Sequence, residues 1–311
     1  MSRIVVTGGS GRLGRSVVRV LAEAGHDVVS IDRAGAEGLP ARQLQIDLLD
    51  AAATREAFAD LAPDAVVHLA AIAVPGSRPD AEIFDVNTRL MWNVLDAVLA
   101  AGVGALLVAS SPTVIGYGAP HGWEPAYLPL DEAHPIAPWT GYAASKVAIE
   151  EIVRMAVRRD GDRARFGVFR PCFVIAPEEW TGAPTQQGHT IVERLADPAL
   201  SAVALFNYVD ARDAGDFVAA WLARAGEVPN GEVFFVGAAD AMVEQPTAEA
   251  LATHVPALAP AAAQLAGSEP VFSSARAERL LGWRARRSWR TELHSAPPAD
   301  PIRTAEEAPH A

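Results

Sequence analysis

The chain has 311 residues, half of them hydrophobic, and its 26 basic and 38 acidic side chains give a net charge of −12 and a pI near 5.1. A chain of this size and composition can bury a large core, so disorder of the whole chain is excluded. The acidic balance argues against nucleic acid and membrane surfaces as partners, because both present negative phosphates. The single cysteine, Cys172, excludes an internal disulfide and a multi-cysteine metal cluster. We therefore expect a cytoplasmic protein without a membrane span or a metal site.

Short apolar runs alternate with helical patterns through the first half of the chain. In chain order, we expect strands at residues 3–7, 28–31, 44–46, 65–69, 105–109 and 166–169, and helices at residues 12–24, 51–61, 81–100 and 140–158. Nearly continuous apolar strands that alternate with helices are typical of a parallel sheet covered on both faces. The predicted fold class is α/β, a Rossmann-type doubly wound parallel sheet with a smaller interleaved C-terminal substrate lobe.

The pattern changes after residue 171, where helices become short and Pro, Gly and aromatic residues gather between residues 177 and 188. A strand at residues 233–236 and a helix at residues 214–225 are expected in this part. We divide the chain into a dinucleotide-binding domain at 1–171, a substrate-binding lobe at 172–294 that is interleaved with it, and a mobile tail at 295–311.

The segment TGGSGRLG, between the first strand and the first helix, predicts a phosphate-binding loop. Its glycines, Gly8, Gly11 and Gly14, suit a tight turn, a close backbone approach to a pyrophosphate, and a helix packed closely on the strand. Three glycines at this spacing are a weak signal alone. The signal gains weight because Asp32 ends the second strand 18 residues after Gly14, where an acid binds the adenosine ribose. We therefore predict a dinucleotide site.

The choice of dinucleotide depends on the charges beside the predicted ribose site. Asp32 favours NAD, since a carboxylate repels the extra phosphate of NADP. Arg12 and Arg33 could each bind that phosphate, so NADP remains an alternative. Asp47, after the third strand, can bind the adenine amino group or simply form a turn.

Tyr142 and Lys146 form the strongest local signal for chemistry. Lys146 is the only lysine among 26 basic residues, and the chain has four tyrosines, one of which precedes it by four positions. That spacing puts both side chains on one face of a helix. An ammonium near a phenol lowers the phenol pKa, which makes Tyr142 a candidate general acid and base. Ser111, at the end of the fifth strand, can donate a hydrogen bond to a substrate oxygen.

The chain resembles the extended short-chain dehydrogenase/reductases, the NAD-dependent epimerase/dehydratase group. The motifs that carry the resemblance occur in the family's order over nearly the whole chain: TGGSGRLG (7–14), HLAA (68–71), DVNT (85–88), VASSPTVIG (108–116), GYAASK (141–146), FRP (169–171), YVDARD (208–213) and LLGW (280–283). The resemblance implies Ser111, Tyr142 and Lys146 as a catalytic triad, with Lys146 also holding the nicotinamide ribose. It further implies Asn87 as a residue that stabilises the site and Thr113 as a second substrate-facing hydroxyl.

The expected cofactor-binding residues are Gly8, Gly11, Arg12, Leu13, Gly14, Asp32, Arg33, Asp47, Leu48, Leu69, Ala70, Ala71, Tyr142, Lys146 and Pro171. The expected substrate-binding residues are Ser111, Thr113, Phe173 and Trp139. By the same resemblance, the two long helices at 81–100 and 140–158 are expected to form a homodimer interface.

Two departures from the family pattern concern the substrate. Phe173 and Phe206 stand where nucleotide-sugar epimerases carry an asparagine and an arginine that contact the sugar nucleotide. With Val174, Trp139 and Trp180 nearby, these residues suggest a less charged substrate, although any of them can be core.

We therefore expect an NAD(P)-dependent oxidoreductase that moves a hydride between nicotinamide and a small alcohol or carbonyl compound other than a nucleotide sugar. The first alternative is an NAD-dependent sugar epimerase or dehydratase, in which NAD is reduced and reoxidised within one cycle. The second alternative is a non-catalytic dinucleotide sensor, which needs the phosphate loop alone and therefore leaves Ser111, Tyr142 and Lys146 unexplained.

Overall fold

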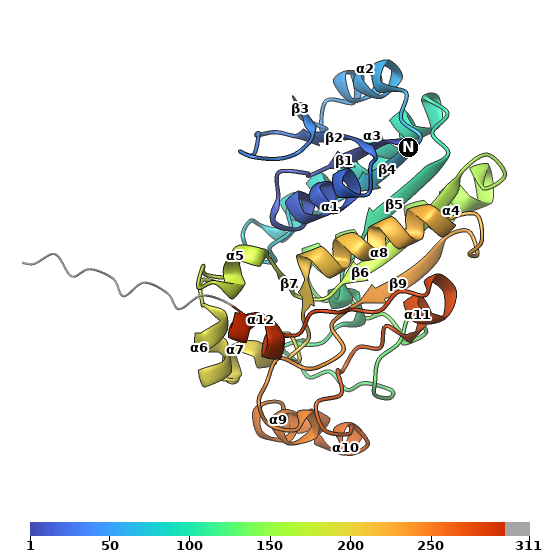
Figure 1. Cartoon of the computed structure of the whole chain (residues 1–311). Helices are drawn as coiled ribbons and strands as arrows, with labels where there is room; N and C mark the ends of the chain where they lie inside the picture. Colours follow the sequence, from blue (N-terminus) through green and yellow to red (C-terminus); the bar gives the residue numbers. More distant parts are fainter. Residues whose placement is uncertain (296–311) are drawn as a thin grey trace, which may run out of the picture.

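The computed structural model describes residues 1–295, and its centre is a seven-stranded sheet in which every strand runs parallel (Figure 1). The strand order is β3-β2-β1-β4-β5-β6-β9, which confirms the doubly wound Rossmann-type class. Its strands are β1 (Arg3–Thr7), β2 (Asp27–Asp32), β3 (Arg42–Gln45), β4 (Ala65–His68), β5 (Ala105–Ala109), β6 (Arg165–Pro171) and β9 (Glu232–Val236). A separate two-stranded sheet pairs β7 (Val174–Ile175) with β8 (Val209–Asp210).

The long helices lie close to their expected positions. The helices are α1 (Arg12–Glu23), α2 (Ala51–Leu61), α3 (Asp80–Ala100), α4 (Gly141–Asp160), α5 (Pro177–Trp180), α6 (Ile191–Ala196), α7 (Ala199–Ala202), α8 (Ala211–Arg224), α9 (Thr247–His254), α10 (Ala259–Ala262), α11 (Ala275–Leu281) and α12 (Trp289–Ser295), with 3-10 turns at Pro112–Ile115 and Pro256–Leu258. Local capping fixes some of these ends. The Asp50 carboxylate, for example, accepts hydrogen bonds from the first backbone amides of α2.

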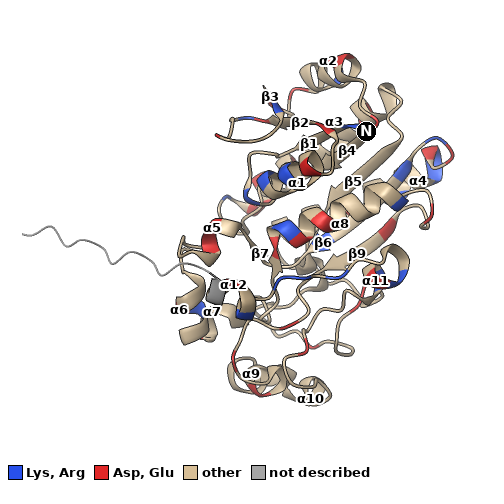
Figure 2. Cartoon of the chain, viewed as in Figure 1, with Lys and Arg blue, Asp and Glu red and all other residues tan. Residues whose placement is uncertain are grey.

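The alternation of side chains along the strands divides the core into two layers. On β1, Ile4 and Val6 face α1 and α8, whereas Val5 faces the layer formed by α2, α3 and α4. Strands β4 and β5 carry no charged side chain, and the charged residues gather on helices and loops (Figure 2). Burial on both faces explains why these strands read as continuous apolar runs.

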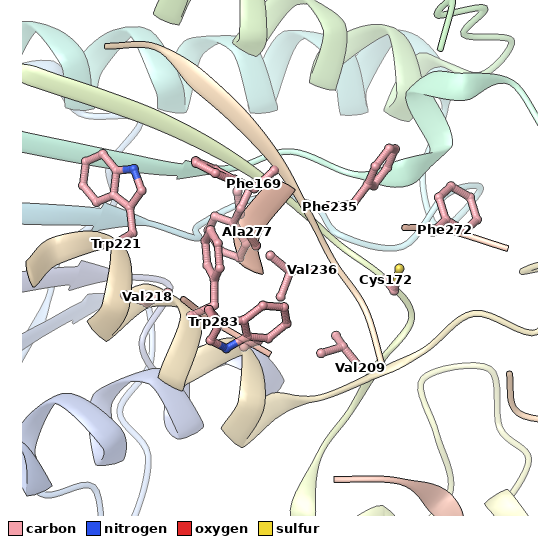
Figure 3. Packing of buried hydrophobic residues seen from close by; sticks show 14 of the residues in the cluster. Phe169, Cys172, Val209, Val218, Trp221, Phe235, Val236, Phe272, Ala277 and Trp283 are labelled. Atoms are coloured by element: carbon pink, nitrogen blue, oxygen red, sulfur yellow. The ribbon is translucent and has the colours of Figure 1, made fainter. Parts of the chain in front are cut away.

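The C-terminal half of the chain returns to the main sheet, so the two parts are interleaved as expected. Strand β9 pairs with β6, and α8 covers the same face as α1. Aromatic side chains fill the space between α8 and these strands, among them Phe169, Trp221 and Trp283 (Figure 3). A Cβ at Gly167 would lie 2.5 Å from the Trp221 ring, so this packing requires a residue without a side chain. The domain boundary at residue 171 stays a prediction.

A smaller lobe built from β7, β8, α5, α6, α7 and α12 lies beside the carboxyl ends of the strands (Figure 1). Its own apolar cluster includes Ile175, Trp180, Ile191 and Tyr208. None of the helices within residues 1–295 is long and apolar enough to cross a membrane. The expected tail at 295–311 lies, from residue 296 onward, outside the described residues.

Candidate active site

One cleft of about 1250 Å³ runs from the N-terminus of α1, past the end of β5, to the smaller lobe. It lies at the carboxyl ends of the parallel strands, where open α/β sheets bind their ligands. All the residues expected to bind the cofactor or the substrate line this cleft. Asn87 is the one expected site residue that does not line it.

The phosphate loop is shaped so that backbone, and not side chain, faces the cleft. Gly8 has φ +72°, and a Cβ there would lie 2.7 Å from the Ala70 nitrogen. A Cβ at Gly14 would lie 2.1 Å from the Gly8 carbonyl oxygen. Gly11 caps α1 without any side-chain hydrogen bond, so the first amides of the helix are free to bind an anion. The loop therefore fits the pyrophosphate of a dinucleotide.

The charged residues near the ribose end favour NAD over NADP. Asp32 accepts hydrogen bonds from the Ser10 nitrogen at 3.1 Å and the Arg33 nitrogen at 2.7 Å, and its carboxylate stays at the cleft wall. Arg12 forms an ion pair with the buried carboxylate of Glu179 in the smaller lobe. Asp47 accepts from the Leu49 nitrogen at 3.0 Å, so it forms the turn that was one of its two expected roles.

The reactive side chains meet at the middle of the cleft, where β5 ends and α4 begins. Ser111 accepts a hydrogen bond from the Thr113 hydroxyl at 2.9 Å. The Lys146 ammonium donates to the carbonyl oxygen of Ala109 at 2.8 Å and lies 5.7 Å from the centre of the Tyr142 ring. Thr140 caps α4 through the Ala143 nitrogen, which places Tyr142 in the first turn and Lys146 one turn later.

The pKa shifts in this cluster differ from the sequence expectation. Burial raises the pKa of Tyr142, and the hydrogen bond with Ser111 opposes that rise. Burial lowers the pKa of Lys146 to about 8, and the carboxylate of Glu150 opposes this. The expected lowering of the Tyr142 pKa by Lys146 is therefore not found in the protein alone, because desolvation outweighs any attraction between the two groups.

Asn87 is buried behind the site, where its side chain forms hydrogen bonds with two other segments of the chain. Its side chain accepts from the Ile72 nitrogen at 2.8 Å, and donates to the Ile72 carbonyl at 3.2 Å and to the Ser145 hydroxyl at 3.1 Å. These bonds tie α3 both to the loop after β4 and to α4. Asn87 is thus placed to position the loop around Ile72, which lines the cleft, and does not itself face a ligand.

The aromatic residues of the substrate half separate into two groups. Phe173 and Trp139 line the cleft, as expected. Phe206 and Trp180 belong to the core: both are buried, and the Trp180 indole donates to the Asp210 carboxylate at 2.7 Å. Sequence reasoning missed the polar residues of the substrate half that line the cleft, Gln186, Gln187 and Asn207. Gln186 and Gln187 lie in a loop without periodicity, whereas Asn207 could have been found from its place beside the YVDARD motif.

The buried ammonium of Lys146 makes stability and activity respond in opposite directions to its removal. In the unfolded chain the pKa of a lysine is about 10.4, whereas that of Lys146 in the folded protein is about 8. Between these two pH values the unfolded chain binds more protons than the folded protein, so the free energy of unfolding rises with pH. We expect Lys146→Met to raise the free energy of unfolding at pH 7 by up to about 3 kcal/mol, and to abolish turnover. Denaturant unfolding of both proteins at pH 7 and pH 10 measures this. The difference should shrink at pH 10, and a variant less stable than the parent at pH 7 would contradict the assignment.

Among the side chains that the structure describes, those of residues 1–293, no group of three or more His, Cys, Asp or Glu is arranged to hold a metal ion. The chemistry of the site is carried by the glycine loop, Asp32, Ser111, Tyr142 and Lys146, which together define an NAD-dependent enzyme of the short-chain dehydrogenase/reductase type. A family model described as the NAD dependent epimerase/dehydratase family matches residues 4–237. The chain belongs to this family, which confirms both the resemblance and NAD as the cofactor.

Several relatives of the chain are named UDP-glucose 4-epimerases. The UDP-glucose 4-epimerase of Mus musculus is 34% identical over 181 residues, which cover 51% of this chain and 50% of that protein. The UDP-glucose 4-epimerase of Azospirillum brasilense is 34% identical over 170 residues, which cover 52% of this chain and 47% of that protein. The chain thus matches about half the length of these relatives.

Solved structures share the fold over nearly the whole chain. A UDP-glucose-4-epimerase from Stenotrophomonas maltophila, with bound NAD and formylated UDP-arabinopyranose, has a TM-score of 0.72 at 20% identity and covers 94% of this chain and 96% of its own. A short-chain dehydrogenase/reductase superfamily protein from Agrobacterium tumefaciens with bound NAD has a TM-score of 0.70 at 24% identity. The match covers 94% of this chain and 95% of that protein's chain.

The comparisons correct one expectation about function. The exclusion of nucleotide sugars, and with it a small alcohol or carbonyl substrate as the main interpretation, is contradicted by relatives that are named UDP-glucose 4-epimerases. The alternative, a sugar epimerase, agrees better with them. The exclusion failed because it rested on Phe173 and Phe206, and Phe206 is a core residue that does not line the cleft.

Proposed function

We propose that this protein is an NAD-dependent epimerase that acts on a nucleotide sugar. The observation that carries the proposal is the size and continuity of the cleft, about 1250 Å³, with the dinucleotide loop at one end and the smaller lobe at the other. Single ligand sites measure roughly 300–1000 Å³, so this cleft has room for NAD and a second large ligand together. Ser111, Tyr142 and Lys146 lie between the two halves, where the reacting carbon would meet the nicotinamide.

In this proposal, the chain's own residues hold the reactants and move one proton. NAD, when bound, supplies the hydride acceptor and donor, and its positive nicotinamide favours the phenolate of Tyr142. Tyr142 removes the proton from the sugar hydroxyl and later returns it to the same oxygen. Ser111, which Thr113 orients, donates a hydrogen bond to that oxygen while it is a carbonyl. Lys146 binds the nicotinamide ribose, and the glycine loop and Asp32 hold the adenosine half.

An epimerase is favoured over a dehydratase by the residues around Ser111. A dehydratase needs a further acid or base beside the serine to expel water from the sugar. Pro112 and Thr113 follow Ser111 in the cleft wall, and neither carries a carboxylate. The carboxylates that line the cleft are Asp32, Asp47 and Glu82, and Asp32 and Asp47 belong to the adenosine end.

The test uses UDP-glucose, deuterated at carbon 4, with the purified protein. We expect UDP-galactose to form with the deuterium retained, because the hydride leaves and returns within one active site. Formation of a keto product with deuterium in released NADH would identify a dehydrogenase and refute the proposal. No reaction with UDP-glucose or with a panel of other UDP-sugars would refute the nucleotide-sugar assignment itself.

We also propose a cytoplasmic homodimer. Helices α3 and α4 pack against each other, and α3 presents Phe84 and Trp92 to solvent, with 41% and 51% of their surfaces exposed. Large apolar side chains two turns apart on one helix face are suited to a partner helix. We expect the protein to sediment as a dimer and Trp92→Glu to sediment as a monomer. A wild-type monomer at micromolar concentration would contradict this proposal.

A further inference from the structure

Arg194, on α6, is a fully buried cation without a counter-charge. Its guanidinium lies 4.6 Å above the ring of Phe173, and its Nη1 donates to the Gln187 side chain at 2.7 Å. Its Nε and Nη2 atoms have no hydrogen-bond partner, and no carboxylate within residues 1–295 forms an ion pair with it. Burial lowers the pKa of Arg194 to about 10, which leaves it charged at neutral pH.

A second fully buried arginine, Arg170, shows what such a residue normally requires. Its Nε and Nη2 atoms donate to the two carboxylate oxygens of Glu150, at 2.8 and 2.9 Å. These two nitrogens form the edge of the guanidinium that binds an oxyanion through two parallel hydrogen bonds. In Arg194 the same edge is the one without a partner. A buried charge in this state is costly, and it is relieved when an anion occupies the edge.

The position of Arg194 indicates which anion this is. Its two contacts, Phe173 and Gln187, both line the substrate half of the cleft. Phe173 and Phe206 stand where nucleotide-sugar epimerases carry an asparagine and an arginine that contact the sugar nucleotide. These two positions therefore offer no cation to a diphosphate in the substrate half of the cleft. Arg194 does not itself line the cleft but lies behind Phe173 and Gln187, and the arginine that lines the cleft away from the phosphate loop and the ribose site is the exposed Arg78.

We propose that Arg194 binds the diphosphate group of the substrate, and that Gln187 is its hydrogen-bond partner when no substrate is present. The inference rests on the proposed function. When the substrate enters, the Gln187 side chain turns aside, and the Nε and Nη2 edge of Arg194 donates two hydrogen bonds to phosphate oxygens. Phe173 stays stacked on the guanidinium and keeps its plane fixed. The aromatic residue that suggested an uncharged substrate thus supports the cation that binds a charged one.

The test compares the binding of UDP and of uridine to the NAD-loaded protein by titration calorimetry. We expect the wild type to bind UDP more tightly than uridine. Arg194→Met should weaken UDP binding by about tenfold to a hundredfold and leave uridine binding unchanged, as expected for the loss of charge-assisted hydrogen bonds. Arg194→Lys keeps the charge but lacks the pair of parallel donors, so its affinity for UDP should lie between that of the wild type and that of Arg194→Met. Arg19→Met, which removes an exposed arginine on α1, is the matched control and should bind as the wild type does.

The possible outcomes separate this inference from the proposed function. Unchanged UDP affinity in Arg194→Met overturns the inference and leaves the epimerase proposal standing. A wild type that binds neither UDP nor uridine refutes the nucleotide-sugar proposal, and the inference with it. We also expect Arg194→Met to melt no lower than the wild type, since it removes an uncompensated charge. Independently of any variant, inorganic pyrophosphate should displace UDP from the wild type, and failure to compete would count against a diphosphate site.

Discussion

Replacement of Tyr142 by phenylalanine is expected to lower turnover by about 1000-fold or more while the protein keeps its NAD. The substitution removes one oxygen atom from a buried ring in the first turn of α4, so the packing of that turn is preserved. What is lost is the group that takes the proton from the sugar hydroxyl and returns it. The affinity for the dinucleotide rests on the glycine loop, Asp32 and Lys146, which the change leaves in place.

The measurement is the rate of epimerisation by the variant, together with the NAD content of the denatured protein. Tyr127→Phe is a matched control, since Tyr127 lies outside the cleft lining and donates to Asp131 in a loop, at 2.6 Å. It should retain turnover. A Tyr142→Phe protein with turnover near that of the wild type would show that another group transfers the proton.

The second large effect concerns the buried ion pair behind the catalytic lysine. Arg170 and Glu150 are exposed by only 2% and 1%, and Glu150 also accepts from the Ser110 hydroxyl at 2.7 Å. Arg170→Met leaves the Glu150 carboxylate buried without its main partner. We expect a loss of about 3–5 kcal/mol in the free energy of unfolding, measured by denaturant titration at pH 7.

The double variant Arg170→Met with Glu150→Met is the informative control. It removes the Glu150 carboxylate that has lost its main partner, so it should be more stable than the single variant.

The pair also bears on catalysis. Glu150 lies one helical turn from Lys146, and its charge raises the pKa of Lys146, which burial lowers. A single variant that unfolds within about 1 kcal/mol of the wild type would show that the pair is dispensable.

The sequence was sufficient to predict the sheet and the residues that line the phosphate-loop end of the cleft, because both depend on local signals. The roles of these residues in binding NAD stay predictions. Strands buried on both faces read as short apolar runs, and the glycines of the phosphate loop occur at a fixed spacing. Tyr142 and Lys146 face the same side because one helix carries both. A strand at residues 233–236 was predicted, but its place in the sheet was not, because β9 comes from a distant part of the chain and pairs with β6 only in the folded protein.

The substrate half could not be predicted in the same way. Its residues come from loops and short helices whose order in space is set by tertiary packing. Phe173 and Phe206 looked alike in sequence, yet Phe173 lines the cleft and Phe206 packs near His254 in the core, with ring centres 6.1 Å apart. Arg194 carried no signal, because it is one of many arginines and its missing counter-charge is visible only in the fold.

The most direct test of the central claim, an epimerase that recycles its own NAD, is to denature the purified protein and quantify the dinucleotide it releases by absorbance and mass. A tightly held, nearly stoichiometric amount of NAD is the predicted result, since the hydride never leaves the site during the cycle. Protein that releases little or none, and that binds added NAD reversibly, would contradict the account and indicate an enzyme that exchanges its cofactor at every turnover.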